Sequence, residues 1–395
     1  MKRTRILAIS MLLILSLMLG ACDSGNTETA VTTPAIVQTS ATTAPVMTTT
    51  TATTPATTAS QTTATSILTE TTVPTEVPSV DPTPGIEAGY NPLTGLKVAD
   101  PARAAKRPVA IMINNIKVAT PQLGINAADL YYEMVVEGGI TRMLVVFSDP
   151  AKVPELGSIR SVRNDYIDYA GGIDAILVSV GGSSIAIDQI NRQKAAHIDM
   201  SDQPQAFWRD PAWREDRGVE HSVRTTGKRL TEAIARMKLR DTLKDPKKSA
   251  FGFLPEGTIA PASDKAKNPA LTVTLRFSNY NTSEFRYDER TGLYSKSQFG
   301  KPQIDLADNQ PLKVTNVLVL RTTIRSVDGT SWRDADLSAG SGYYISGGAR
   351  LPIKWKKGAT TDPFIFTRED GSPLLINRGK TYVCVQSVNE PVTFK

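Results

Sequence analysis

A threonine-rich stretch near the amino terminus limits which part of this chain can fold into a compact body. Residues 23–88 contain 23 threonines in 66 positions, with no lysine or arginine and no periodic run of apolar side chains. Such a segment cannot bury enough apolar surface to offset the conformational entropy that it would lose on ordering. We therefore expect residues 23–88 to form a disordered, extended stalk, with the folded body beginning at residue 89.

The 22 residues before this stretch have the three parts of a secretory signal. Three basic residues precede an apolar segment from Ile6 to Leu19. At about 1.5 Å per residue this segment reaches roughly 21 Å, which is shorter than a hydrocarbon core of about 30 Å. The signal ends in Leu-Gly-Ala-Cys, which resembles a bacterial lipobox and implies cleavage before Cys22 with lipid attached to it. The alternative is an ordinary signal peptide with a coincidental cysteine.

The net charge is distributed unevenly along the chain. The whole chain carries +6, but the stretch 23–88 holds six carboxylates and the signal three basic residues, so the body carries +9. A basic body is compatible with nucleic acid, but the predicted location outside the membrane argues against it and favours anionic wall polymers or lipid headgroups as partners. Two cysteines and two histidines are too few for a disulfide framework or a zinc cluster, and we expect no metal and no cofactor.

The amino-terminal half of the body alternates between strand and helix patterns. Residues 108–115 form an apolar run typical of a buried strand, and residues 128–149 predict a hairpin with a glycine pair at its turn. Residues 173–182 predict another strand, which leads into a serine-capped helix over 183–193. A threonine-capped helix is predicted over 226–240, where apolar positions recur with helical spacing. This alternation indicates a mixed α/β domain.

After about residue 250 the pattern changes to short strand-like segments, separated by turn residues at intervals near ten. This rhythm is typical of antiparallel β-structure. We therefore predict an α+β protein, in which a mixed α/β amino-terminal domain precedes a smaller, antiparallel, β-rich carboxyl-terminal domain. The expected parts are a lipoprotein signal (1–22), a stalk (23–88), an α/β domain (89–250), a connector (251–268) and a β-rich domain (269–395).

Several segments of the body, taken in order, resemble the YerB-like family of bacterial lipoproteins. They include NPLTGLKVADPARAAKRPVAIMINN, YYEMVVEGGITRMLVVF, LGSIRSVRNDYIDYAGGIDAILVSVGGS, EHSVRT, FRYDERTGLY, NVLVLRTTI, GSGYYISGGARLPIKWKKG and DGSPLLINRGKTYVCV. The resemblance covers essentially residues 91–390 and implies an α/β domain followed by a smaller β-rich one. It implies no activity, because the family is defined as a domain of unknown function. Cys384 stands where related sequences usually carry an aromatic residue, which argues against a special role for this cysteine.

The segment GSIRSVR is the strongest candidate for a binding site. Arg160 and Arg163 are three residues apart, which places them on one face if the turn is helical. Ser158, Ser161 and the N–H groups at the start of a helix expected over 163–172 would complete a set of donors for an anion. A phosphate, a wall-peptide carboxylate or an anionic wall polymer would suit these donors. The alternative is structural ion pairing of both arginines with neighbouring carboxylates, namely Asp165, Asp168 or Glu133.

Two glutamates in the predicted hairpin are candidates for acid–base chemistry. Glu133 and Glu137 are four residues apart, so a continuous strand would place both on the same face. Such a pair carries out acid–base chemistry if its surroundings raise one of the two pKa values. The alternative is a structural role, in which the carboxylates form salt bridges to Arg142 and Arg160.

A glycine loop and a histidine cluster complete the candidates. Gly181, Gly182 and Ser183 connect a predicted strand to a helix, and such a loop lets a ligand approach the backbone. Without a G-x-G-x-x-G pattern or a Walker lysine, the loop equally fits a role in packing. Glu220 and His221 are adjacent, but no nucleophile motif such as G-x-S-x-G accompanies them. A structural role for His221 is therefore the alternative to general acid–base catalysis.

These observations predict a lipid-anchored extracytoplasmic protein, held on the outer side of the cytoplasmic membrane by Cys22. We expect a non-catalytic binding or assembly module that recognises a wall polymer, a phosphate or a carboxylate group, or that contacts another envelope protein. The rival hypothesis is an envelope hydrolase or transferase that uses Glu133 or Glu137 together with Arg160 and His221. The sequence does not decide between binding and catalysis. An arrangement of these side chains around one cleft would favour the enzyme.

Overall fold

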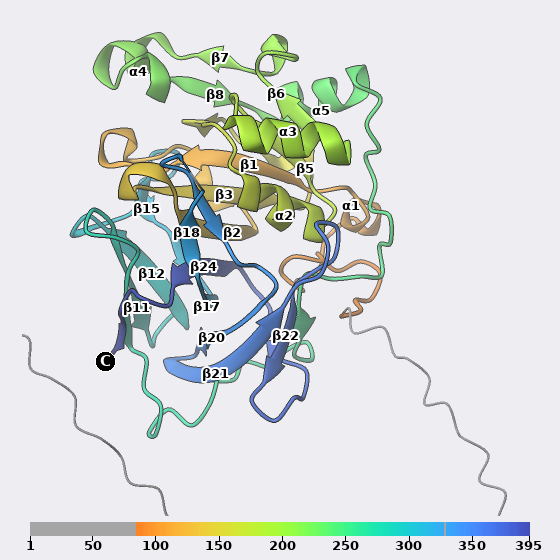
Figure 1. Cartoon of the computed structure of the whole chain (residues 1–395). Helices are drawn as coiled ribbons and strands as arrows, with labels where there is room; N and C mark the ends of the chain where they lie inside the picture. Colours follow the sequence, from red (N-terminus) through yellow and green to blue (C-terminus); the bar gives the residue numbers. More distant parts are fainter. Residues whose placement is uncertain (1–83, 328) are drawn as a thin grey trace, which may run out of the picture. The chain divides into compact units, whose positions relative to one another are not determined.

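The computed structural model describes residues 84–327 and 329–395. The predicted signal peptide, the predicted anchor Cys22 and most of the predicted stalk lie outside the described residues. Within the described ranges, no helix combines the length and the apolar character that crossing a membrane requires. The described part is rich in β-structure, with five helices and several sheets (Figure 1).

Four of the five helices in the described ranges begin with a side-chain cap, and α2 does not. Their bounds are α1 (Pro101–Ala104), α2 (Asn164–Gly172), α3 (Ser184–Gln193), α4 (Pro211–Asp216) and α5 (Gly227–Arg236). The Ser183 hydroxyl accepts a hydrogen bond from the Ala186 amide before α3, and the Thr226 hydroxyl accepts one from the Arg229 amide before α5. Each bond satisfies an amide that has no partner inside its helix. The three predicted helices are thus confirmed as α2, α3 and α5.

The largest element is a ten-stranded sheet with strands from both halves of the body. From one edge to the other its strands are β22 (Ile365–Arg368), β21 (Ala349–Lys356), β20 (Ala339–Ser346), β17 (Asn316–Thr322), β24 (Thr381–Ser387), β2 (Leu130–Val135), β3 (Thr141–Phe147), β1 (Val109–Asn114), β5 (Ile176–Ser179) and β6 (His197–Asp199). The strands β1, β5 and β6 run parallel, as do β17, β24 and β2. The predicted hairpin is confirmed as the antiparallel pair β2–β3.

A second, six-stranded sheet belongs to the carboxyl-terminal half. It contains β13 (Lys301–Pro302), β12 (Leu293–Gln298), β11 (Thr282–Asp288), β10 (Thr272–Arg276) and β25 (Val392–Phe394), with β16 (Lys313–Val314) paired to β12. The smaller sheets are β14 (Ile304–Asp305) with β15 (Gln310–Pro311), β18 (Ile324–Ser326) with β19 (Arg333–Ala335), β23 (Leu375–Ile376) with β9 (Gly252–Phe253), and β4 (Leu156–Gly157) with β8 (Val223–Thr225) and β7 (Trp208–Arg209).

The prediction of a purely antiparallel carboxyl-terminal half is correct for the second sheet and wrong for the large one. All pairs in the second sheet are antiparallel. In the large sheet, β24 runs parallel to both of its neighbours, β17 and β2. A parallel pair requires a long crossover connection, and the chain between β17 and β24 is long enough to supply one. Short turn spacing in the sequence reveals hairpins but does not reveal such a crossover.

Both faces of the large sheet are covered, which explains why its central strands are apolar at nearly every position. In β1, the side chains of Val109, Ile111 and Ile113 belong to one buried cluster, and those of Ala110 and Met112 belong to the other. Successive side chains of a strand point to opposite faces, so the alternation assigns each residue to its cluster. The first cluster includes α5 and the second sheet, and the other includes α2 and α3, which lie together over the sheet (Figure 1).

A fully buried carboxylate lies where the two halves of the body meet. Glu133 is on β2 of the large sheet, and its Oε2 is 3.3 Å from Nζ of Lys296 on β12; both side chains have zero solvent exposure. The Glu133 carboxylate also accepts hydrogen bonds from Asn115 Nδ2 at 2.8 Å, Thr141 Oγ1 at 2.7 Å and the Tyr382 hydroxyl at 2.6 Å. These donors come from both halves of the body and offset the cost of removing the charge from water.

The buried ammonium of Lys296 has its own set of partners. It donates to Gln298 Oε1 at 3.1 Å and to Gln303 Oε1 at 2.8 Å, and it lies 5.3 Å from the centre of the Tyr382 ring. The shared sheet and this network join segments that the sequence assigns to two domains. The boundary between residues 89–250 and 269–395 therefore stays a prediction about the chain's organisation.

We predict that Lys296→Met destabilises the protein by about 3–5 kcal/mol, because it leaves the Glu133 carboxylate buried without its cation. The double variant Glu133→Gln/Lys296→Met removes both charges, so it is expected to lose less stability than the sum of the two single variants. Urea unfolding followed by circular dichroism measures these differences. Lys354→Met, at an exposed position on β21, is the control and is expected to stay near the wild-type stability. Additive losses in the double variant would contradict the proposed pairing.

Candidate functional site

The predicted site residues gather at the carboxyl ends of the parallel strands β1 and β5. In open sheets with parallel strands, ligands commonly bind at this edge. The segment that contains Arg160 crosses it, since the Arg160 amide donates to the Met112 carbonyl of β1 at 3.0 Å and the Arg160 carbonyl accepts from the Val180 amide at 3.1 Å. The Val162 amide in turn donates to the Gly181 carbonyl at 3.0 Å. The arginine segment and the glycine loop, apart in the sequence, are thus neighbours.

The glycine loop is shaped by close packing against this segment. Gly181 has a φ of +68°, which favours glycine, and its amide donates to Asp199 Oδ2 at 2.6 Å. A Cβ atom at Gly182 would lie 2.8 Å from Cγ1 of Val162, which leaves no room for a side chain. Ser183 uses its hydroxyl to cap α3. Gly181, Gly182 and Ser183 therefore have a structural role, because they hold the loop between β5 and α3 against the segment that contains Arg160.

Two arginines share one carboxylate at this edge. The Glu137 carboxylate, in the turn between β2 and β3, accepts hydrogen bonds from Nε of Arg163 at 2.8 Å and from Nη2 of Arg142 at 3.2 Å, and it also pairs with Nη2 of Arg163. Arg142 donates in addition to the Ser161 carbonyl, and Arg163 to the Val162 carbonyl at 2.8 Å. The side chains of both arginines are at least nine-tenths buried.

Electrostatics hold this cluster in its charged form. Burial raises the pKa of the Glu137 carboxyl, but hydrogen bonding from Arg163 and the charges of Arg142 and Arg163 outweigh it and place the pKa below its ordinary value. Burial lowers the pKa of the Arg142 guanidinium to about 9, and the neighbouring charge of Arg163 acts in the same direction. Arg142 therefore stays protonated at neutral pH, and the carboxylate stays ionised.

Arg160 has different partners from Arg142 and Arg163, and its ion pair is longer. Its Nη1 donates to the Glu220 carbonyl at 2.9 Å, and its Nη2 lies 3.8 Å from the Glu220 carboxylate, which is 69% exposed. Within the part of the chain that the structure describes, Nε of Arg160 is buried and has no hydrogen-bond partner. Burial lowers the pKa of the Arg160 guanidinium, and the charge of Glu220 opposes this shift. Arg160 thus retains a donor that no protein acceptor uses.

His221 lies beside Arg160 at the end of β1. Its Nδ1 is 2.7 Å from Nδ2 of Asn114, the last residue of β1. Burial and the charge of Arg160 lower the pKa of the His221 imidazole, so the ring is neutral at pH 7. A neutral ring accepts the hydrogen bond from the Asn114 amide through Nδ1.

The structure brings most of the predicted residues together, but not all of them. Arg160, Ser161, Arg163, Glu137, Glu220, His221 and the glycine loop share one edge of the sheet. Glu133 does not, because it lies in the buried network with Lys296, and β2 ends before Glu137. The prediction that Glu133 and Glu137 share a strand face is therefore wrong. Ser158 is fully buried, and its hydroxyl has no hydrogen-bond partner within the described ranges.

The predicted alternative partners of the arginines are also wrong. Neither Asp165, Asp168 nor Glu133 pairs with Arg160 or Arg163; Glu137 and Glu220 do. The predicted salt bridge of the hairpin glutamates with Arg142 is present for Glu137. Arg142 was not predicted as a site residue, although an arginine inside an apolar strand pattern is a signal for a buried ion pair. Asn114, a polar residue at the end of an apolar run, was not predicted either.

A buried acid lies at the start of α2, directly after Arg163. The Asp165 carboxyl accepts the Ala335 amide through Oδ1 at 2.9 Å, whereas Oδ2 has no hydrogen-bond partner among the described residues. Burial, with the nearby charge of Asp334, raises the pKa of the Asp165 carboxyl to about 8. Asn164 donates to Asp334 at 2.7 Å, so the beginning of α2 docks onto β19 of the carboxyl-terminal half.

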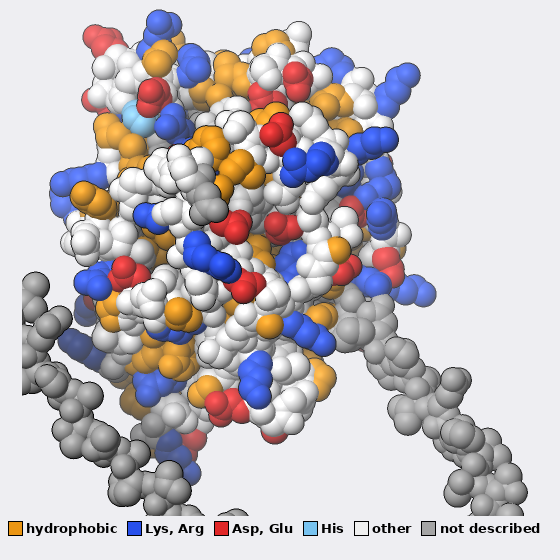
Figure 2. All heavy atoms as spheres, viewed as in Figure 1, with side chains coloured by type: hydrophobic (Ala, Val, Ile, Leu, Met, Phe, Trp, Pro, Cys, Tyr) orange, Lys and Arg blue, Asp and Glu red, His pale blue; other side chains and the backbone are white. Residues whose placement is uncertain are grey.

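Basic side chains are scattered over the visible face of the molecule among acidic ones, as Figure 2 shows. The surplus of positive charge in the body therefore does not form one broad patch on that face. The local cluster is different, since among the described residues the ion-pair partners of Arg142, Arg160 and Arg163 are Glu137 and the exposed Glu220. The fold and the site thus define a sheet-rich protein of mixed helices and strands with a locally basic edge.

Comparison with known proteins places this chain in a family. Residues 93–240 match the family described as "Protein of unknown function (DUF3048) N-terminal domain", and residues 273–383 match the corresponding "C-terminal domain". The chain belongs to this YerB-like family, which confirms the resemblance drawn from the sequence motifs.

Two relatives extend this assignment. The chain is 27% identical over 297 residues to "Putative lipoprotein YerB" of Bacillus subtilis (strain 168), a match that covers 74% of this chain and 84% of the relative. It also resembles the crystal structure of YerB from Bacillus subtilis, with a TM-score of 0.66 and 24% identity, over 77% of this chain and 99% of that chain. The second likeness shows that the fold is shared.

We predict that Asp165→Asn changes how stability depends on pH. The folded-state pKa of Asp165 lies above the ordinary value of 3.8, so the native state retains a proton that the unfolded chain releases. Stability therefore falls as pH rises from about 4 to about 8, and the variant lacks this loss. Urea unfolding is expected to show that the stability of the variant relative to the wild type is higher at about pH 8.5 than at about pH 5. Parallel pH profiles would contradict the raised pKa.

Proposed function

We propose that this protein is a lipid-anchored, extracytoplasmic, non-catalytic binding module that recognises an anionic group at the edge containing Arg160. The lipobox-like end of the signal at Cys22 supports the anchor, as does the lipoprotein name of the Bacillus subtilis relative. The phosphates and carboxylates of wall polymers and wall peptides, and another envelope protein that presents such a group, are the partners that suit this location.

The observation that carries this proposal is the unused donor of Arg160. The Arg160 side chain is 23% exposed, and its Nε is buried without an acceptor among the described residues, which is costly for a donor. Its nearest carboxylate, on Glu220, is 3.8 Å away and largely in water, so it contributes little. An incoming anion can replace Glu220 and use the guanidinium fully, since ionised acceptors form the stronger hydrogen bonds.

Arg142 and Arg163 support the same proposal by their charge. They share a single carboxylate, Glu137, so the cluster of three arginines keeps a positive surplus even with Glu220 counted. The low pKa of Glu137 makes this carboxylate an ion-pair partner rather than a proton donor. Glu133 lies in the core, with zero exposure, and does not reach a ligand at the edge. These features favour binding over acid–base catalysis.

We predict that phosphate raises the melting temperature of the full chain and that Arg160→Gln abolishes this effect. At roughly 100 times the dissociation constant, the expected gain is about 2.7 kcal/mol, which corresponds to several degrees for a protein of this size. The assay is thermal unfolding of the detergent-solubilised full chain, with inorganic phosphate, glycerol 3-phosphate and acetate as separate ligands.

Two further variants make this test specific. Glu220→Gln removes the competing carboxylate, so it is expected to increase the shift caused by phosphate. Arg214→Gln, an exposed arginine on α4, makes the same charge change as Arg160→Gln and is expected to leave the shift unchanged. Equal shifts in the wild type, Arg160→Gln and Arg214→Gln would show that phosphate acts elsewhere. No shift with any of the three anions would reject the proposed ligand class.

We also predict that the mature chain begins at Cys22 and carries lipid on that residue. Mass spectrometry of protein extracted from membranes is expected to find an amino-terminal peptide heavier than its sequence by the mass of the attached lipid. Cys22→Ser is expected to remove this mass. An unmodified Cys22, or cleavage at another position in the wild type, would contradict the anchor.

A further inference from the structure

A pocket lies at the amino ends of the parallel strands, opposite to the arginine cluster. It is lined by Pro108, which precedes β1, and by Ile173 and Asp174, which precede β5, so it lies at the amino ends of these strands. Its other walls come from the connection after α5, residues 243–250, and from the turn between β21 and β22. The volume is about 740 Å³, within the range of small-molecule sites, which is roughly 300–1,000 Å³.

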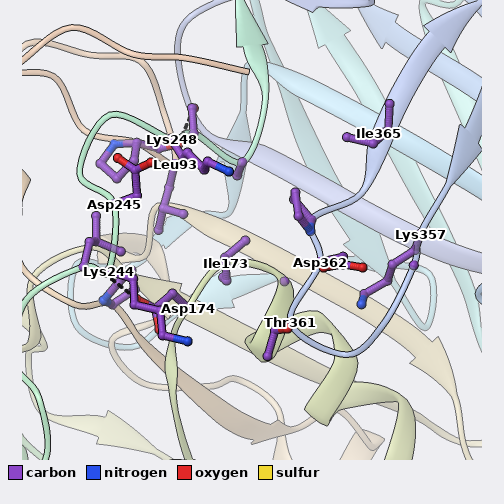
Figure 3. A pocket seen from close by; sticks show the side chains of 18 of the residues that line it. Leu93, Ile173, Asp174, Lys244, Asp245, Lys248, Lys357, Thr361, Asp362 and Ile365 are labelled. Atoms are coloured by element: carbon purple, nitrogen blue, oxygen red, sulfur yellow. Dashed lines mark hydrogen bonds between the residues drawn. The ribbon is translucent and has the colours of Figure 1, made fainter. Parts of the chain in front are cut away.

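The apolar walls of this pocket are aliphatic. The larger apolar side chains in its lining are Leu93, Ile173, Leu243 and Ile365, together with prolines, and no aromatic residue of the described part of the chain lines it. Figure 3 shows Leu93, Ile173 and Ile365 on different sides of the space, each from a different part of the chain. Such walls provide contacts for a flexible hydrocarbon chain and offer no ring on which a flat ligand could stack.

Cationic side chains surround these apolar walls. Lys244, Lys248, Lys356 and Lys357 all line the pocket. The buried ammonium of Lys357 is occupied, since it donates to the Ala359 carbonyl at 2.7 Å and to the Thr360 carbonyl at 3.1 Å. Lys244 and Lys356 are exposed, and within the described ranges neither ammonium group has an acceptor or an ion-pair partner.

The carboxylates in the lining are already engaged. Asp174 pairs with Arg107 at 3.5 Å and with Arg240 at 2.5 Å, and it accepts the Lys244 amide at 2.9 Å. Asp245 accepts the Lys247 amide through Oδ1 at 3.0 Å, and Asp362 accepts the Ala359 amide through Oδ2 at 2.8 Å. Four lysines and three aspartates line the pocket, and Asp174 already pairs with two arginines outside the lining. The pocket therefore combines an aliphatic interior with a surplus of positive charge.

We propose that this pocket binds an amphiphilic anion. The aliphatic chain of the ligand lies against Leu93, Ile173 and Ile365, and its anionic head, a carboxylate or a phosphate, meets Lys244 and Lys356. Burial of the chain supplies most of the affinity, and the two lysines select for charge. This site is separate from the arginine cluster, and it does not depend on the function proposed for that cluster.

Photo-crosslinking of the full chain in membranes tests this proposal. The probe is dodecanoate with a diazirine in its chain, and mass spectrometry locates the labelled peptides. Labelling is expected in the segments 243–250 and 356–365, and unlabelled dodecanoate or dodecyl phosphate is expected to compete. The corresponding diazirine alcohol has no charge and is expected to label these segments less. Competition by one of the two anions identifies the preferred head, whereas competition by neither would overturn the proposal.

Matched variants separate the lysines of the pocket from general charge effects. Lys244→Gln/Lys356→Gln is expected to reduce labelling by about fivefold or more. Lys247→Gln/Lys354→Gln changes two neighbouring lysines that do not line the pocket, and it is expected to label like the wild type. Thr361→Trp places a large side chain in the lining and is expected to block labelling, with an unchanged melting temperature showing that it folds. Equal labelling in all variants would overturn the proposal.

Discussion

The buried ion pair between Glu133 and Lys296 is the interaction on which the rest of this structure depends. Two charges with zero solvent exposure are stable only when their hydrogen-bonding capacity is filled, and here donors and acceptors from both halves of the body fill it. Tyr382, which donates to Glu133, is on β24, the strand that carries the large sheet from one half to the other. The network therefore requires a specific docking of the halves, and apolar burial alone would not specify it.

This docking leaves both ends of the parallel strands β1 and β5 accessible, namely a carboxyl edge and an amino edge of this part of the sheet. At the carboxyl edge, the chain crosses the strand ends and pairs Arg142 and Arg163 with Glu137, while Arg160 contacts Glu220 and keeps an unused donor. At the amino edge, the turn between β21 and β22 approaches the connection after α5 and encloses an aliphatic pocket. We propose a compact anion as the ligand of the first edge and an anion with a hydrocarbon chain as the ligand of the second. Both ligand types occur at a membrane surface or in a cell wall.

The sequence predicted local structure well and long-range partners poorly. The apolar run of β1, and the caps at Ser183 and Thr226, depend on nearby residues, so these elements were predictable. The parallel insertion of β24 and the pairing of Glu133 with Lys296 join residues far apart in the chain, and no local pattern encodes them. In the candidate site, the sequence indicated the arginines and the glycine loop. It placed Glu133 there wrongly, because four-residue spacing means a shared face only if the strand continues.

The most direct test of the central claim is a crystal structure of the protein with phosphate. The account predicts an anion within hydrogen-bond distance of the Arg160 guanidinium, with the Glu220 carboxylate displaced and the pairing of Glu137 with Arg142 and Arg163 unchanged. A structure at saturating phosphate that shows no anion at this edge, with Arg160 still bound to Glu220, would contradict it.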